Sequence, residues 1–255
     1  MTATERVPVE RKTHRFRPAA NWVAVIVVPL GVFVATLVAD LNAGDRVLYN
    51  VDRFALLALF AAVIQCVILA ATVPWWSAGL LDTGGFGALI SALRVLAMTL
   101  ATTVFLLVLA LLQDRAGAGA MLKIQLVVFA WGLALAGLAG VLRVLLRRTT
   151  VAAVLTSVIG LLVVATPFWG NVLIAVAGRA GRVCVVAATP LSAASDAVGQ
   201  AYDVFHGRLL YDLSVVGSGA AYALPVWWVW ALVTGLVGVA MVVAVTFIRR
   251  HLIIR

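Results

Sequence analysis

Six long apolar runs constrain the fold of this chain more than any other feature. Each run is close to the 20 or so residues that an α-helix needs to cross the hydrocarbon core of a bilayer. An apolar segment in lipid must satisfy its own backbone hydrogen bonds, so each run predicts a helix, and the runs are too continuous for the alternating pattern of a β-barrel. The runs occupy residues 21–40, 54–76, 93–113, 122–143, 150–171 and 223–248.

The composition agrees with a membrane location. Hydrophobic residues make up 64% of the 255 residues and charged residues 11%, against about a quarter charged in soluble domains. The net charge of +9 does not indicate a nucleic-acid partner, because the basic residues lie at the ends of the apolar runs instead of forming one stripe. We therefore predict an all-α integral membrane protein with six transmembrane helices, whose surroundings are the lipid bilayer.

The distribution of charge predicts the orientation. With the N-terminus in the cytoplasm, the inside segments hold twelve basic and three acidic residues, and the outside segments hold seven of each. Basic residues concentrate on the cytoplasmic side of membrane proteins, so both termini are expected there. The first run is long and no small-x-small cleavage pattern follows it before Asp40, so we interpret it as a retained signal anchor in a bacterial cytoplasmic (inner) membrane.

These runs divide the chain into five parts. The first is a basic segment at the cytoplasmic interface, and the last is a short basic tail. Between them lie five spans, an external stretch of about fifty residues and a sixth span. The boundaries are 1–20, 21–171, 172–222, 223–248 and 249–255.

The sequence lacks the residues that several function classes require. No run carries an ionisable residue at its centre, which argues against a proton pump or a proton-coupled antiporter. There is no GxxxxGK[ST] phosphate-binding loop and no metal-binding spacing of Cys or His, so we expect no ATP hydrolysis, metal or cofactor on this chain. Cys66 lies inside an apolar run and is expected to be a buried hydrophobic residue, not a disulfide partner of Cys184.

Small residues occur together in two of the runs. They lie in "WGLALAGLAG" (131–140) and "GLVGVA" (235–240). Small side chains let two membrane helices approach closely, so these stretches predict tight helix packing in a bundle.

The cytoplasmic loop between the second and third runs, residues 77–92, is rich in glycine. Asp82 or Thr83 is placed to cap a short helix over 85–94, which would present Phe86 and Leu89 to a soluble partner. The alternative is that the third span begins earlier than residue 93.

The external stretch is half apolar. Arg179 and Arg182 are one turn apart on a helical face, and Thr189 followed by Pro190 is typical of a helix start. Two short amphipathic helices joined at 188–189 would dip into the outer leaflet and return, packed on the bundle. The alternative is an interfacial loop that only closes the fold.

The layout resembles the six-span permease subunits of type-2 ABC exporters. That family has an interfacial N-terminal helix, a coupling helix between spans two and three, and an external helical hairpin between spans five and six. The run "TPLSAASDA" (189–197) looks like an Asn-Pro-leading run of the family, with Thr189 in the Asn position. By this resemblance, the ATPase-coupling loop contains Leu81, Asp82, Gly84, Gly85, Phe86 and Leu89, and the external hairpin contains Arg179, Arg182, Thr189, Pro190 and Asp196.

The resemblance also implies a set of partners. They are cytoplasmic ABC ATPase subunits that bind ATP-Mg and a second permease copy or paralogue. Whether an extracytoplasmic subunit also docks on 172–222 is left open by the sequence. The expected function is export or extraction of an amphipathic or lipid-linked substrate, with no enzymatic activity on this chain.

Two other classes remain open from the sequence. One is a non-catalytic anchor or assembly subunit of a larger membrane complex. The other is a membrane-embedded lipid-modifying enzyme, for which the candidate polar residues are Asp196, Asp203, His206, Arg208 and Asp212.

Overall fold

The computed structural model describes residues 18–43, 53–80, 86–113, 118–199 and 224–253. Every element in these ranges is an α-helix. The helices are α1 (Pro18–Ala43), α2 (Arg53–Leu80), α3 (Gly87–Gln113), α4 (Ala118–Leu146), α5 (Thr149–Val164), α6 (Thr166–Trp169), α7 (Asn171–Ala188), α8 (Pro190–Val198) and α9 (Trp227–Ile253).

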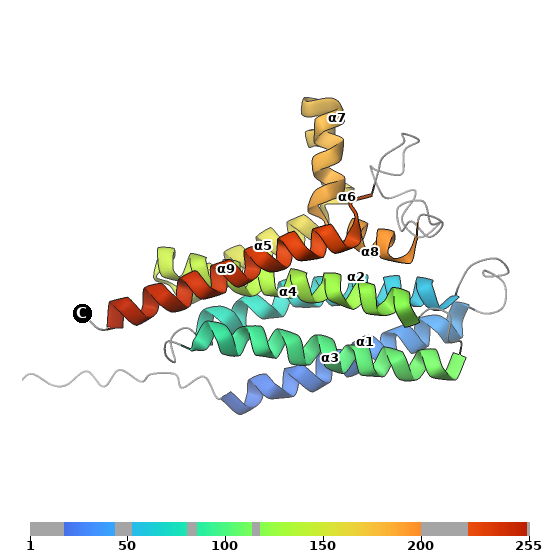
Figure 1. Cartoon of the computed structure of the whole chain (residues 1–255), viewed down its shortest axis with the longest axis horizontal. Coiled ribbons are helices and arrows are strands. Elements are labelled where there is room, and N and C mark those ends of the chain that lie inside the picture. Colours follow the sequence, from blue (N-terminus) through green and yellow to red (C-terminus); the bar gives the residue numbers. More distant parts are fainter. Residues whose placement is uncertain (1–17, 44–52, 81–85, 114–117, 200–223, 254–255) are drawn as a thin grey trace, which may run out of the picture.

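The long helices lie side by side along one direction, and α7 projects across it (Figure 1). Helix α4 is central, because it contacts α2, α3, α5, α8 and α9. The two-residue connection between α4 and α5 makes these helices antiparallel neighbours, and its Arg147 takes a left-handed backbone conformation with φ 55°.

Four of the described helices are long and apolar enough to cross a membrane. Their apolar segments are Ala58–Gly79, Gly87–Val108, Gly119–Leu146 and Trp227–Ile248. The bent pair Ile174–Ala188 and Pro190–Val198 makes a fifth if it counts as one span, and Val25–Val38 and Thr149–Val164 are shorter apolar helices. The all-α prediction is confirmed for the described residues, and these helices are those of a multi-pass membrane protein.

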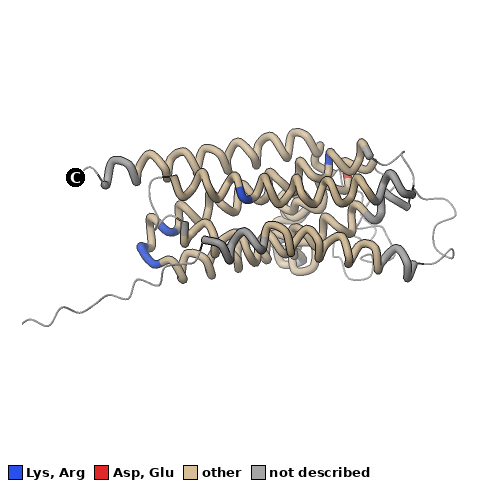
Figure 2. The backbone as a smooth tube through the Cα atoms, turned by 90° about the horizontal axis from the view of Figure 1, so that it is seen from below, with Lys and Arg blue, Asp and Glu red and all other residues tan. Residues whose placement is uncertain are grey.

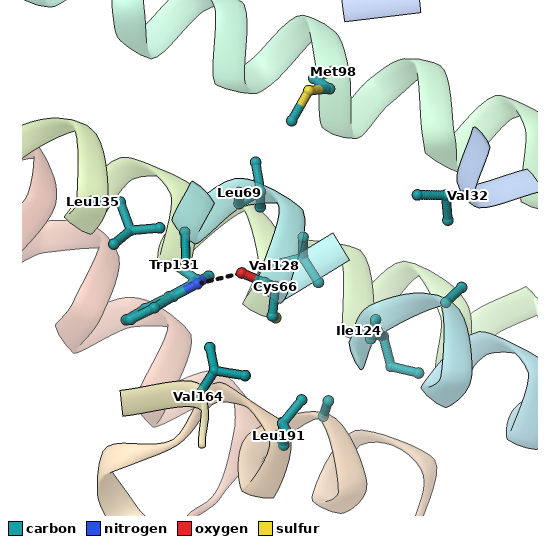
Figure 3. Close-up of a cluster of buried hydrophobic side chains, with 14 of the residues drawn as sticks. Val32, Cys66, Leu69, Met98, Ile124, Val128, Trp131, Leu135, Val164 and Leu191 are labelled. Atoms are coloured by element: carbon teal, nitrogen blue, oxygen red, sulfur yellow. Dashed lines mark hydrogen bonds between the residues drawn. The ribbon is translucent and has the colours of Figure 1, made fainter. Parts of the chain in front are cut away.

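The bundle core is built from buried side chains of seven helices, α1 to α5, α7 and α8. The Trp131 ring of α4 belongs to this cluster, and its indole N–H donates to the Cys66 carbonyl of α2 at 3.4 Å (Figure 3). Cys66 is 1% exposed and Cys184 is exposed, and both thiols are free, as the sequence predicted. Buried residues of the same cluster are Val32, Leu69, Met98, Leu135, Val164 and Leu191.

Glycines bring α4 and α9 into backbone contact. A Cβ atom at Gly238 would lie 2.7 Å from the Leu133 carbonyl carbon, and one at Gly137 would lie 2.8 Å from the Gly238 oxygen. Real Cβ contacts are never this short, so only glycine permits the observed approach. The prediction of close packing through 131–140 and 235–240 is confirmed.

Two helix boundaries differ from the predictions. Helix α3 begins at Gly87 and runs without a break to Gln113, so the prediction of a separate short helix over 85–94 is wrong and the early start of the third helix is confirmed. No proline or glycine follows Gly87 in α3, so nothing ends the helix after its first turns. The fifth run was expected to continue to residue 171, but α5 ends at Val164.

Candidate functional site

The early end of α5 has a local cause. Pro167 has no amide hydrogen, and its ring collides with the carbonyl four residues earlier, so a helix cannot continue through it undisturbed. The Thr166 hydroxyl donates to the Val163 carbonyl at 2.7 Å, and the Trp169 indole N–H donates to the Leu162 carbonyl at 2.8 Å. These two bonds satisfy carbonyls near the end of α5, and the single turn α6 leads the chain into α7.

Helix α7 reverses direction at Gly178. This residue has φ 54° and ψ −122°, a conformation that residues with a side chain rarely adopt. A Cβ atom at Gly170 would lie 2.5 Å from Val185 Cγ2, although fifteen residues separate the two positions. Residues 171–177 and 179–188 therefore form two limbs that lie against each other at their roots, with Gly178 at the tip.

The tip of α7 stands clear of the bundle (Figure 1). Residues 175–180 are all exposed, and Val176 reaches 85%. Arg179 is exposed near the tip, and Arg182 is half-buried farther along the second limb. Both cations lie beyond Gly178, so the reversal separates them from the apolar first limb.

In contrast to the exposed tip of α7, helix α8 is buried in the bundle. It is bent by 76° relative to Ile174–Ala188 of α7, and it contacts α2, α4 and α9. Thr189 is fully buried and caps α8, with its hydroxyl accepting from the Leu191 N–H at 3.4 Å, and Pro190 occupies the first turn. The predicted helix start at Thr189 and Pro190 is confirmed.

Polar groups of α8 lie deep inside the protein. The hydroxyl of Thr189 also points to the Val164 carbonyl, 3.4 Å away, which ties the start of α8 to the end of α5. Ser192 and Ser195 are fully buried. The Ser192 hydroxyl has no hydrogen-bond partner among the described residues, and native proteins leave few such groups.

Helices α7, α8 and α9 meet at the start of α9. Asp196 of α8 accepts a hydrogen bond from the Trp227 N–H at 2.9 Å, which places its carboxylate at the N-terminus of α9, where negative charge is favoured. The Trp230 indole N–H donates to the Ala187 carbonyl at 2.9 Å, which fastens the root of α7 to α9. The Lys123 ammonium lies 5.8 Å from the centre of the Trp227 ring.

This junction is the candidate functional site. No family model, curated protein or solved structure matches the chain. The described parts of the chain that bear on function are the α7–α8–α9 junction and the start of α3.

Most of the predicted coupling loop, namely Leu81, Asp82, Gly84 and Gly85, lies outside the described residues. Phe86 and Leu89 are described, at the start of α3, and are 57% and 48% exposed. Among the polar residues considered for a lipid-modifying enzyme, Asp203, His206, Arg208 and Asp212 also lie outside the described ranges. Within the described ranges, no group of three His, Cys, Asp or Glu residues is placed to hold a metal ion.

The structure also shows polar contacts that the sequence reasoning missed. Gln65 of α2 and Gln125 of α4 are buried and exchange two amide hydrogen bonds of 3.3 and 2.9 Å. Each glutamine is the only side-chain amide in its apolar run. Because membrane helices associate through such polar groups, the pair was predictable from the sequence. Ser77 of α2 and Ser91 of α3 form a second buried hydrogen bond between helices.

Arg94 lies deeper in its helix than the sequence predicted. The sequence placed it at the cytoplasmic end of the third run, but α3 begins earlier, so Arg94 is the eighth residue of the helix and only 2% exposed. The described basic residues otherwise lie chiefly toward the ends of the long helices (Figure 2). A buried arginine inside a membrane bundle faces the protein interior, where its long side chain finds polar neighbours.

Proposed function

We propose that the chain is the transmembrane permease subunit of an ATP-driven ABC transporter. In this proposal it spans a bacterial cytoplasmic membrane six times with both termini in the cytoplasm, and α7 and α8 lie at the external side. It works with a second permease copy or paralogue and with separate ATPase subunits that bind ATP-Mg. The cargo is an amphipathic or lipid-linked molecule that is exported or extracted from the membrane.

The observation that carries this proposal is the pair formed by α7 and α8. A chain that only needed to join two spans would run over the surface, where water satisfies its backbone. Here the connection reverses at Gly178, bends again at Thr189 and buries all of the first six residues of α8 among other helices. Broken helices of this kind occur at membrane depth where they are buried in protein or line a pathway.

The start of α3 supports the ATPase contact. Phe86 and Leu89 begin an exposed apolar stripe that continues along α3 through Leu93, Leu96, Leu100 and Val104. At the proposed cytoplasmic end of α3, Phe86 and Leu89 are accessible to a soluble partner, whereas the rest of the stripe faces lipid.

The first test is purification of the tagged chain from its native membrane in mild detergent, with mass spectrometry of the associated proteins and an ATPase assay. We expect a stoichiometric nucleotide-binding subunit with ATPase activity. The double substitution Phe86→Ala/Leu89→Ala should release that subunit, whereas the matched pair Leu100→Ala/Val104→Ala on the same stripe should retain it. Recovery of other membrane or secreted proteins without an ATPase would instead support an anchor or assembly subunit.

A second test concerns the side of the membrane. Cys184 is exposed on α7 and Cys66 is buried, so the chain carries one accessible thiol among its two cysteines. A membrane-impermeant maleimide should label Cys184 in intact cells, and Cys184→Ser should abolish the label. Labelling that requires permeabilised cells would place α7 on the cytoplasmic side and contradict the proposed topology.

A further inference from the structure

A small cavity lies inside the bundle between α1, α2 and α3. It is lined by Val28, Gln65, Leu69, Met98, Thr99 and Thr102. Three of these six side chains are polar, and all three polar ones are buried. Figure 3 shows two of the apolar lining side chains, with Met98 of α3 pointing toward Leu69 of α2.

The cavity lies well below the ends of the long helices. Gln65 is inside the apolar segment Ala58–Gly79 of α2, and Thr99 and Thr102 are inside Gly87–Val108 of α3. Bulk water does not reach this depth of a bilayer, so polar side chains here need hydrogen-bond partners inside the protein. The occupant of the cavity must therefore be able to form hydrogen bonds with these three side chains.

The hydrogen bonds of the lining residues leave complementary positions for such an occupant. Gln65 Nε2 donates one hydrogen to Gln125 Oε1 at 3.3 Å, and an amide nitrogen carries a second hydrogen that it can donate. The Thr99 hydroxyl donates to the Val95 carbonyl at 2.9 Å and the Thr102 hydroxyl to the Met98 carbonyl at 3.0 Å. Each hydroxyl oxygen can still accept a hydrogen bond. The cavity thus offers one donor and two acceptors.

Size and charge narrow the choice of occupant. The cavity has a volume of about 10 Å³, the room that a single water molecule needs, and it is too small for a lipid chain or a metabolite. None of its lining residues is acidic, so a metal cation would be buried there without a carboxylate ligand. A water molecule has two hydrogens to donate and accepts readily, which matches one donor and two acceptors.

We propose that this cavity binds one water molecule inside the membrane. The water accepts from Gln65 Nε2 and donates to the hydroxyl oxygens of Thr99 and Thr102, and three hydrogen bonds are typical of buried water in proteins. Because Gln65 is already bonded to Gln125 of α4, the water joins α3 to the amide pair of α2 and α4. This inference goes beyond the transport proposal and does not depend on any partner.

The test is X-ray hydroxyl-radical footprinting of the full chain in lipid nanodiscs. X-rays split bound water, and the radicals oxidise the nearest side chains, with methionine converted to its sulfoxide. Met98 lines the cavity, whereas Met121 is fully buried in the same core and lies outside the lining, so it is the internal control. Mass spectrometry should show that Met98 is oxidised several-fold faster than Met121. Equal rates at the two residues in the wild-type chain would overturn the proposal.

Variants test the hydrogen bonds to the water. Thr99→Val/Thr102→Val keeps the shape of the two side chains without their hydroxyls, and Met98 oxidation should fall to the rate of Met121. The control is Thr103→Val, because Thr103 lies on the same helix outside the lining and its hydroxyl donates to the Thr99 carbonyl at 2.7 Å. This control should oxidise Met98 as the wild type does. Wild-type oxidation in the double variant, or an equal fall in the control, would overturn the assignment of the water to these hydroxyls.

The choice of buffer separates water from a cation. The rate of Met98 oxidation should be the same in sodium chloride and potassium chloride. A rate that changes when one salt replaces the other would show that a cation occupies the cavity, and would overturn the proposal.

Discussion

Helices α4 and α9 are both long and apolar, yet the protein uses them in opposite ways. In the apolar segment of α4, 72% of the residues are buried inside the protein, against 17% for α9. The more exposed helix is the more apolar one, with a mean hydropathy of 2.5 against 2.0. In a bilayer, hydropathy shows that a helix enters the membrane and does not show what the helix packs against, because lipid is as apolar as a leucine side chain.

The difference between the two helices comes from small and polar residues. Helix α4 carries Gly132, Gly137 and the buried amide of Gln125, and these groups meet neighbours on several sides. Helix α9 presents Gly238 to α4, and most of its large aliphatic side chains are exposed on the outside of the bundle. Two features therefore decide which helices pack together in this bundle. One is the positions where small residues let two backbones approach, and the other is the positions of buried polar groups that need a hydrogen-bond partner.

The largest expected effect is at the contact that joins the two helices. Gly238→Ala places a methyl group 2.7 Å from the backbone of α4, which forces the helices apart and should cost about 2 kcal/mol of unfolding free energy. Gly235→Ala is the matched control, because its added methyl group would lie 3.7 Å from the Ala130 side chain, an ordinary contact. Unfolding in mixed micelles of increasing SDS content measures the unfolding free energy of both variants. Equal losses would show that Gly238 is not what holds α9 against α4.

A smaller effect is expected from the amide pair that fixes α4 against α2. Gln65→Leu leaves the Gln125 amide buried without its partner and should cost about 1–2 kcal/mol. The double variant Gln65→Leu/Gln125→Leu removes both polar groups and should recover part of that loss. A complete double-mutant cycle in the same micelles measures the coupling, and additive losses would mean that the two amides do not stabilise each other.

The smallest expected effect is at the N-terminus of α9. Asp196→Ala removes the carboxylate from the Trp227 N–H and should cost about 1 kcal/mol. Hydrogen exchange at the Trp227 amide should become faster. Asp196→Asn keeps a hydrogen-bond acceptor without the charge, so its exchange rate at the Trp227 amide should lie between those of the wild type and Asp196→Ala. Unchanged exchange in Asp196→Ala would show that α8 does not cap α9.

Much of the fold was predictable from local sequence. The length and hydropathy of the runs at 54–76, 122–143 and 223–248 place α2, α4 and α9 to within a few residues, since these properties decide where a helix enters lipid. The cap at Thr189 was predictable for the same local reason: a hydroxyl before a proline satisfies the first turn of α8. Thr189 and Pro190 were also among the site residues expected from the sequence.

Other parts depend on contacts between distant segments and were not predictable in this way. Gly178 is one of two glycines in "AGRAG", and the local sequence does not show which of the two takes the positive φ of the reversal. The burial of Arg94 depends on how α3 turns against its neighbours, which its position in the sequence does not determine. The roles of Trp230 and Lys123 at the junction likewise exist only once α9 lies beside α4 and α7.

The reversal in α7 limits how neighbouring molecules can be arranged around this protein. The second limb has ten residues and extends about 15 Å, which is more than the 10 Å or so diameter of a helix. Because α7 stands out beside the first turns of α9, another helix that approaches α9 on that side meets α7 before it reaches Trp230. A neighbouring helix on this side must contact α9 farther from its N-terminus, toward Val243 and Phe247. Helix α7 therefore acts as a spacer that decides which part of α9 a neighbouring helix can reach.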